Sequence, residues 1–165
     1  MAQVSIDVSR HPMQLVCLSF VFFSDALEDA FGTCAYARWQ LSNGKYDVRF
    51  IAAKSRVAPL KRLTIPHLEL QGAVLASRLC KTIVEQCCFQ FEKTVLFLDS
   101  KIILVRVGEI QSNTDPAQWR RILGQLNVAD DVSRGIPATS LVERWKHGPK
   151  FLCLPEKSGR KIHQN

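Results

Sequence analysis

Four acidic side chains occupy positions from which they could converge on divalent cations. Asp25 directly follows the apolar run Phe20–Phe23, and Asp99 directly follows a second apolar run. Glu69 lies near the start of one helical pattern, and Asp130 lies near the start of a later one. Carboxylate oxygens are hard ligands that suit Mg²⁺ or Mn²⁺, and two such ions about 4 Å apart can promote hydrolysis of a phosphodiester. The four acids therefore indicate a metal-dependent nuclease.

Each acid also has an ordinary structural interpretation. Glu69 would be favourable near a helix N-terminus because of the helix dipole, and Asp130 could be an ordinary first-turn acid. Asp25 and Asp99 are harder to explain in this way, because each follows a hydrophobic strand and neither stands in a turn motif. The interpretation therefore depends on the elements that position the four side chains.

Three strands are predicted in the first third of the chain. Cys17–Ser24 is rich in β-branched and aromatic residues, and Thr33–Gln40 and Asp47–Lys54 are two further strand-like runs. Asn43-Gly44 between the second and third runs is a strong hairpin signal. An antiparallel three-strand meander is expected.

A helix and a fourth strand follow. From Pro66 to Cys88 the apolar residues recur every three or four positions, which is the period of an amphipathic helix. Thr64 is placed to cap its start, and Pro66 suits its first turn. Lys93–Leu98 then has the apolar character of a central strand.

The last third of the chain carries shorter elements. Ile102–Val107 is a short apolar segment, and Ser112–Pro116 is a polar turn. Trp119–Leu123 is expected to be a strand, and Asn127–Ser133 is expected to begin the last helix. This order predicts a mixed α/β domain. Strand ends and helix starts meet at one edge of such a sheet, so the four acids are expected to meet there.

Charge and length constrain the function class. The chain has 165 residues with 22 Lys and Arg against 15 Asp and Glu, a formal charge of +7. This excess favours a polyanionic partner, although a basic surface can also serve solubility alone. We expect a leader over residues 1–16, one domain over 17–155 and a basic tail over 156–165. The candidate contacts to nucleic acid are Lys54, Arg56, Lys61, Arg62, Arg121 and Arg134.

The six cysteines show neither a Cys-x-x-Cys pair nor a zinc-like spacing, so free thiols in a reducing compartment are expected. The apolar stretch Met13–Phe23 is shorter than the roughly 20 residues that span a bilayer, and it fits a buried strand better than a signal peptide. We therefore expect an intracellular protein, cytoplasmic or nuclear, that is neither secreted nor bound to a membrane.

Five strings of the sequence also occur together, in this order, in a known family. They are Phe23–Ala26, Ala52–Leu60, Leu63–Leu70, Leu98–Ser100 and Asn127–Gly135. With this order and spacing, the chain from Phe23 to Glu156 resembles the ribonuclease H region of Bel/Pao retrotransposon polyproteins. The resemblance implies a ribonuclease H-like mixed sheet, with an antiparallel meander plus parallel strands, flanked by helices.

The resemblance also implies an activity and a setting. The domain would cleave the RNA strand of an RNA/DNA hybrid during reverse transcription, using two Mg²⁺ or Mn²⁺ ions. Asp25 and Asp99 would hold both ions, Glu69 would bind one, and Asp130 would be the fourth acid. Asp131 is the adjacent alternative, but Asp130 fills the family's Asn-x-Ala-Asp pattern. The remaining partners would be the polyprotein's reverse transcriptase, protease and integrase, none of which leaves a motif in this chain.

The chain departs from the family pattern in two places. Only a short segment separates Ser100 from Glu109, so ~15 residues, about four helical turns, are expected to be deleted after the fourth strand. Arg121 stands where the family usually carries a His. These departures keep two alternatives open: a catalytically impaired remnant that only binds nucleic acid, and a basic module that docks an acidic protein.

Overall fold

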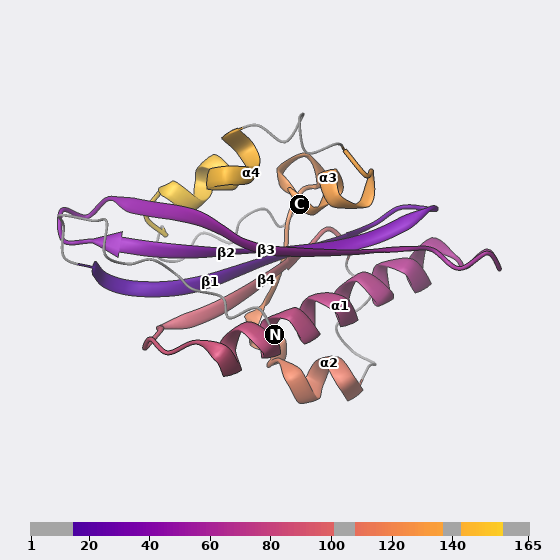
Figure 1. Cartoon of the computed structure of the whole chain (residues 1–165), viewed down its shortest axis with the longest axis horizontal. Coiled ribbons are helices and arrows are strands. Elements are labelled where there is room, and N and C mark those ends of the chain that lie inside the picture. Colours follow the sequence, from indigo (N-terminus) through magenta and orange to yellow (C-terminus); the bar gives the residue numbers. More distant parts are fainter. Residues whose placement is uncertain (1–14, 101–107, 137–142, 157–165) are drawn as a thin grey trace.

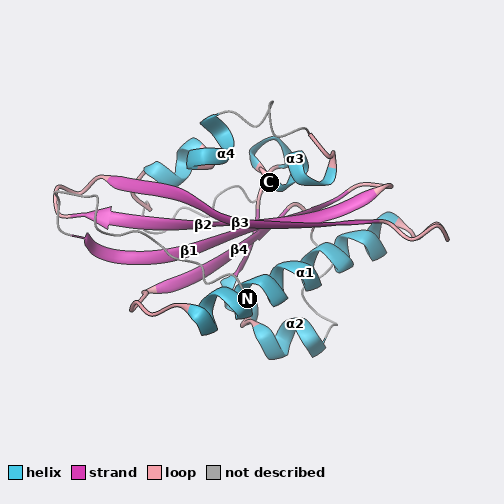
Figure 2. Cartoon of the chain, viewed as in Figure 1, coloured by secondary structure: helices cyan, strands magenta, loops and turns pink. Residues whose placement is uncertain are grey.

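A five-stranded mixed sheet separates two layers of helices (Figure 1). The computed structural model describes residues 15–100, 108–136 and 143–156. Helices α1 (Ile65–Gln86) and α2 (Gly108–Asn113) cover one face of the sheet. Helices α3 (Ala129–Ser133) and α4 (Glu143–His147) cover the other (Figure 2). The strand order is β3-β2-β1-β4-β5.

The predicted antiparallel meander is confirmed, and each strand is longer than expected. The strands are β1 (Leu15–Ala26), β2 (Ala30–Leu41) and β3 (Tyr46–Val57). Antiparallel pairing continues almost to the turns, with Ala26 opposite Phe31 at one end. Pairing of this kind satisfies backbone groups beyond the apolar runs from which the bounds were predicted.

Strand β1 is buried on both faces because it lies in the middle of the sheet. Phe20 and Phe22 pack in the core on the side of α1, while Val21 and Phe23 pack in the core on the opposite side. Side chains alternate between the two faces of a strand, so odd-numbered residues near the end of β1 lie on the face of Val21 and Phe23, and even-numbered residues lie on the face of α1.

Helix α1 matches the predicted helix to within two residues at each end. Its small residues Gly72, Ala73 and Ala76 are buried, which lets the helix lie close against the sheet. Thr64 is the N-cap residue as expected, but its hydroxyl makes no capping bond to the backbone. It lies 3.0 Å from Nδ1 of His67 instead.

The elements after α1 extend the sheet on its other side. Strand β4 (Lys93–Leu98) pairs in parallel with β1, and β5 (Trp119–Arg121) pairs in parallel with β4. The predicted segment Ile102–Val107 lies outside the described residues. Helix α2 is held to α1 by Arg78, whose Nε and Nη2 donate to the two carboxylate oxygens of Glu109 at 2.5 and 3.0 Å.

The prediction that the helix beginning near Asn127 is the last one is wrong. Helix α4 and a 3-10 turn, Lys150–Cys153, follow it and cover the face of the sheet near β3. Trp145 of α4 packs against Phe50 of β3 with ring centroids 5.2 Å apart. An element of one turn is too short to show a helical period, so α4 could not be predicted from the pattern of apolar residues.

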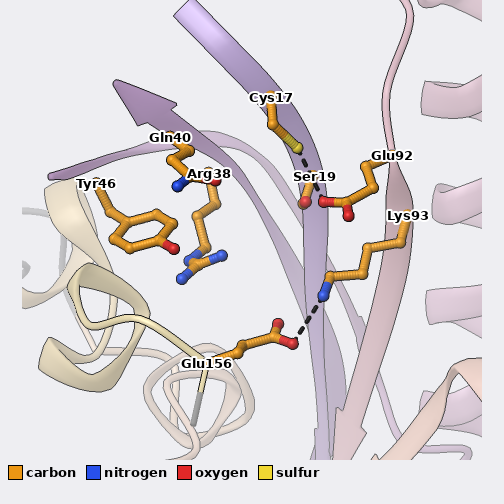
Figure 3. Close-up of a pocket in the computed structure, with 8 residues that line it drawn as sticks. All are labelled: Cys17, Ser19, Arg38, Gln40, Tyr46, Glu92, Lys93 and Glu156. Atoms are coloured by element: carbon orange, nitrogen blue, oxygen red, sulfur yellow. Dashed lines mark hydrogen bonds and ion pairs between the residues drawn. The ribbon is translucent and has the colours of Figure 1, made fainter. Parts of the chain in front are cut away.

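The segment after α4 is bound to the end of the sheet where β1 begins (Figure 3). Arg38, which is 8% exposed, donates Nε to the carbonyl of Leu152 and Nη2 to that of Leu154, both at 2.7 Å. Its guanidinium lies 3.8 Å from the centroid of the Tyr46 ring. Nζ of Lys93 forms an ion pair with Oε2 of Glu156 at 2.7 Å. These side chains line the pocket drawn in Figure 3, and most of their charged groups are already bound within the protein.

Two further predictions concern the cysteines and membranes. All six cysteines are free, as expected. Among the helices that the structure describes, none is both long and apolar enough to cross a membrane.

Replacing Arg38 should destabilise the fold, because the buried carbonyl oxygen of Leu152 and the partly buried one of Leu154 would lose charged donors. We expect Arg38→Met to lower the free energy of unfolding by about 2–4 kcal/mol. Urea denaturation measures it. Arg49→Met is the matched control, since the Arg49 side chain is 55% exposed and an exposed ion pair contributes less than about 1 kcal/mol. Equal losses in the two variants would contradict a specific role for Arg38.

Candidate functional site

Asp25 and Asp99 lie side by side at one end of the sheet. The parallel pairing of β1 with β4 sets Phe23 opposite Phe97. Asp25 lies two residues after Phe23 within β1, and Asp99 is the first residue after β4. Side chains alternate between the two faces of a strand, so Asp25 lies on the same face as Phe23, which belongs with Phe97 to the core on the α3 side of the sheet. The register brings the ends of β1 and β4 to the same edge of the sheet, which is the edge where these two acids were expected to meet.

Helix α3 is bound to this end of the sheet by two polar side chains. Asn127, which is fully buried, donates Nδ2 to the carbonyl of Ser24 at 2.9 Å. Ser133 donates its hydroxyl to Oδ2 of Asp25 at 2.5 Å, and both residues are buried. Neither residue was among the predicted site residues. Their only sequence signal was their place in the Asn127–Gly135 string.

The two acids of α3 face different neighbours. Oδ1 of Asp130 accepts from Nε of Arg134 at 2.8 Å, and its charge acts on both Asp25 and Asp99. Oδ2 of Asp131 instead accepts from the indole N–H of Trp145 at 3.1 Å, in α4. Asp131 therefore has a structural contact, and Asp130 is the α3 acid electrostatically coupled to the two strand-end acids.

Burial and repulsion perturb the two strand-end carboxyls. Burial raises the pKa of Asp25 to about 6, the hydrogen bond from Ser133 opposes this rise, and the charges of Asp99 and Asp130 add to it. Burial also raises the pKa of Asp99, while the nearby Arg121 lowers it. A carboxyl that ionises with difficulty beside other carboxylates is a position where a cation would be stabilising.

Glu69 is the one predicted acid that lies in α1, on the opposite side of the sheet from α3. It is the fifth residue of α1, so its predicted place in the first helical turn is wrong by about one residue. Three residues later, Gly72 packs so tightly that a Cβ there would lie 3.1 Å from the carbonyl oxygen of Asp25. Residues three apart share a helix face, so Glu69 sits on the turn of α1 adjoining Asp25.

The four acids match a hard divalent cation in chemistry but are not drawn together as a ligand set. Carboxylate oxygens in mutual repulsion are the donors that Mg²⁺ prefers. Among the residues that the structure describes, however, no three His, Cys, Asp or Glu side chains are grouped closely enough to hold a metal ion. Asp25 is engaged by Ser133, and Asp130 is engaged by Arg134.

The six candidate contacts to nucleic acid are all exposed, in two groups. Lys54 and Arg56 lie on β3, and Lys61 and Arg62 lie in the loop between β3 and α1. Arg121 and Arg134 lie beside the acids. Nε of Arg121 donates to the carbonyl of Asp99 at 3.1 Å, so the residue in the place of the family's His contacts the backbone of a candidate metal ligand.

The family model described as the Pao retrotransposon-like RNaseH-like domain matches residues 3–100, more than half of the chain. The chain belongs to this family. The predicted family and fold are therefore confirmed, with the antiparallel meander and the parallel strands in one helix-flanked sheet. The region matched to the Pao domain contains Asp25, Glu69 and Asp99, whereas Asp130 lies beyond it.

Among solved structures, the chain is similar to the N-terminal RNase H domain of a Mycobacterium tuberculosis protein determined as a fusion with maltose-binding protein. The match has 14% identity and a TM-score of 0.39, and it covers 72% of this chain and 95% of that one. No curated protein matches the chain closely enough to count as a relative.

Asp25 should reduce stability at neutral pH in the absence of metal. Its pKa is about 6 in the folded protein and about 4 in an unfolded chain, so stability should fall as pH rises between these values. Asp25→Asn removes this penalty, and we expect it to raise the free energy of unfolding by up to about 3 kcal/mol at pH 7.5. Denaturation in EDTA at several pH values measures the gain.

The gain should disappear below pH 4, where both states carry a protonated carboxyl. Asp29→Asn, an exposed acid in the β1–β2 turn, is the control and should change stability by less than about 0.5 kcal/mol. A gain for Asp25→Asn that is independent of pH would contradict the electrostatic explanation.

Asn127 should be important for stability because its amide satisfies a buried carbonyl of β1. We expect Asn127→Ala to lower the free energy of unfolding by about 1–3 kcal/mol, the cost of an unsatisfied buried acceptor. The matched control is Asn113→Ala at the end of α2, where the amide makes only a long 3.4 Å contact with Ser77. If thermal or urea denaturation gives equal losses, α3 is not held in this way.

Proposed function

We propose that the chain is a ribonuclease H-type endonuclease that cleaves the RNA strand of RNA/DNA hybrids. The observation that carries the proposal is the register of β1 and β4, which puts Asp25 and Asp99 next to each other with Asp130 acting electrostatically on both. Membership of the Pao RNaseH-like family supports the same assignment and suggests a role in retrotransposon reverse transcription.

In this proposal the four acids hold two Mg²⁺ or Mn²⁺ ions. Asp25 and Asp99 would contact both ions, Glu69 would bind one, and Asp130 would complete the set. When bound, the metal pair activates a water and stabilises the leaving oxygen of a phosphodiester. The Ser133 hydroxyl fixes one oxygen of Asp25. Arg134 neutralises Asp130 in the metal-free chain and would have to release it for Asp130 to bind metal.

The hybrid would be held by exposed cations near this end of the sheet. Arg121 and Arg134 lie beside the acids, and Lys54, Lys61 and Arg62 extend the basic surface toward α1. Contacts to phosphates dominate the affinity of such complexes and make it sensitive to salt. The rest of a retrotransposon polyprotein, including reverse transcriptase, protease and integrase, would be the protein setting of the domain.

A remnant that binds hybrid without cutting it is the second candidate. Two observations favour it: the family match ends at residue 100, and only the short segment 101–108 separates Ser100 from Glu109. The family's additional residues at this point are expected to contribute to hybrid binding. Their loss would weaken binding of the hybrid but would leave the sheet and α1 in place.

The test is cleavage of an end-labelled RNA/DNA hybrid in Mg²⁺ and in EDTA. We expect cleavage only with Mg²⁺, and we expect Asp99→Asn to reduce it by more than the roughly 10–100-fold that loss of a group supporting a metal ligand costs. Asp131→Asn is the matched control, because Asp131 contacts Trp145 instead of the strand-end acids. It should retain cleavage.

Each result separates the two candidates. Salt-dependent binding of hybrid with no cleavage by the wild-type protein would support the remnant. Full cleavage by Asp99→Asn would show that the chemistry lies elsewhere in the chain. Cleavage lost equally in the Asp99→Asn and Asp131→Asn variants, with both folded, would contradict the division of roles between the two faces of α3.

A further inference from the structure

An open groove of about 280 Å³ lies between the meander and α1. Its apolar lining includes Phe31 of β2, Leu63 of the loop before α1, and Val74 and Leu75 of α1. Arg56 and Arg78 also line it. Sites for cofactors and drug-sized ligands usually range from about 300 to 1,000 Å³, so this groove suits one or two side chains.

Several apolar side chains around the groove are exposed to solvent. Val57, which lines the groove, is 83% exposed, and the neighbouring Leu60 and Ile65 are 106% and 40% exposed. Apolar residues scattered singly on a surface need no explanation, but several gathered around an apolar hollow are typical of a protein-binding surface. The groove and these three residues form what we call the loop surface.

The charge of the loop surface specifies its partner further. Between Asp47 and Glu69 the sequence has no acidic residue, and its basic residues there are Arg49, Lys54, Arg56, Lys61 and Arg62. Among the described residues, the side chain of Arg56 has no hydrogen-bond or ion-pair partner. The other arginine of the groove, Arg78, is bound through two hydrogen bonds to the carboxylate of Glu109. A carboxylate is therefore present at one arginine and absent at the other.

Helix α2 shows which side chains can bind beside an arginine on this side of the sheet. Glu109 binds Arg78 while the next residue, Ile110, is 3% exposed and packs into the core beside α1. An acidic residue followed by an apolar residue thus matches the chemistry on this side of α1. The groove beside Arg56 offers the same combination of an apolar hollow and a cation.

We propose that the loop surface docks a protein segment that carries an acidic residue next to an apolar one. The apolar side chain packs in the groove against Val57, Leu63 and Val74, and the carboxylate pairs with Arg56. This inference does not depend on the nuclease activity. A nucleic acid explains the exposed Val57, Leu60 and Ile65 less well, because phosphates gain nothing from aliphatic side chains. Phe31, the aromatic residue of the groove lining, is 6% exposed and leaves little ring face for a base to stack on.

The experiment uses a terminally blocked Glu-Ile-Gln peptide, a copy of residues 109–111, titrated into the ¹⁵N-labelled protein and followed by NMR. We expect shifts at the amides of Phe31, Leu63 and Leu75. Arg56→Glu should weaken this binding by about fivefold, which corresponds to the upper end of the range for an exposed ion pair, and should create binding to an Arg-Ile-Gln peptide. Lys54→Glu, on the same strand but outside the groove lining, is the matched control and should bind as wild type does.

Three results would overturn the proposal. One is the absence of shifts at the groove, or shifts confined to another surface. Another is equal weakening by Arg56→Glu and Lys54→Glu, which would show a diffuse charge effect. The third is displacement of the peptide by a short RNA/DNA hybrid that shifts the same groove amides, which would assign the groove to nucleic acid. None of these results depends on whether the protein cleaves hybrid, so the nuclease proposal stands or falls separately.

Discussion

The parallel pairing of β1 with β4 is the constraint on which the rest of the structure depends. It requires a long connection between the two strands, which the meander and α1 supply, and it places both strands in the interior of the sheet. Because both strands run in the same direction, Asp25 near the end of β1 and Asp99 directly after β4 lie at the same edge of the sheet. The chemistry assigned to Asp25 and Asp99 is thus a consequence of strand direction and of a register that aligns Phe23 with Phe97.

Repulsion between these carboxylates opposes folding, and neighbouring side chains reduce this repulsion. Ser133 donates to Asp25, Arg134 pairs with Asp130, and Arg121 lowers the pKa of Asp99. All three residues are polar or basic and lie within or close to α3 and β5. The arrangement is a compromise in which the acids stay near each other without metal, at the expense of a raised pKa at Asp25.

Much of the fold could be predicted from the sequence because it is encoded in periodicity. The strand-like composition of β2 and β3, the turn at Asn43-Gly44 and the helical spacing of α1 are local signals, and the observed elements agree with them. The juxtaposition of Asp25 and Asp99 could be inferred because both follow central strands. In contrast, α4 is one turn long, and Arg38 reaches carbonyls more than a hundred residues away. Contacts of that kind leave no periodic trace.

Asn127 and Ser133 illustrate the same limit within the site. Their hydrogen bonds join α3 to residues about a hundred positions earlier in the chain, and no local pattern distinguishes them from ordinary helix-end residues. The choice between Asp130 and Asp131 is similar, because adjacent residues of a helix point about 100° apart. Only the packing of α4 against Asp131 shows which of the two is turned away from the strand-end acids.

The contact between Arg78 and Glu109 bears on how such a domain tolerates changes in length. The chain is fixed before residue 101 by the pairing of β4 and is fixed again after residue 107 by this contact and by the burial of Ile110. The two anchors are independent of the number of residues between them. The entropy of closing a loop grows only slowly with its length, so insertions and deletions between the anchors leave the sheet almost unaffected. In evolutionary terms, this junction is where members of the family can differ in length while inheriting the same scaffold.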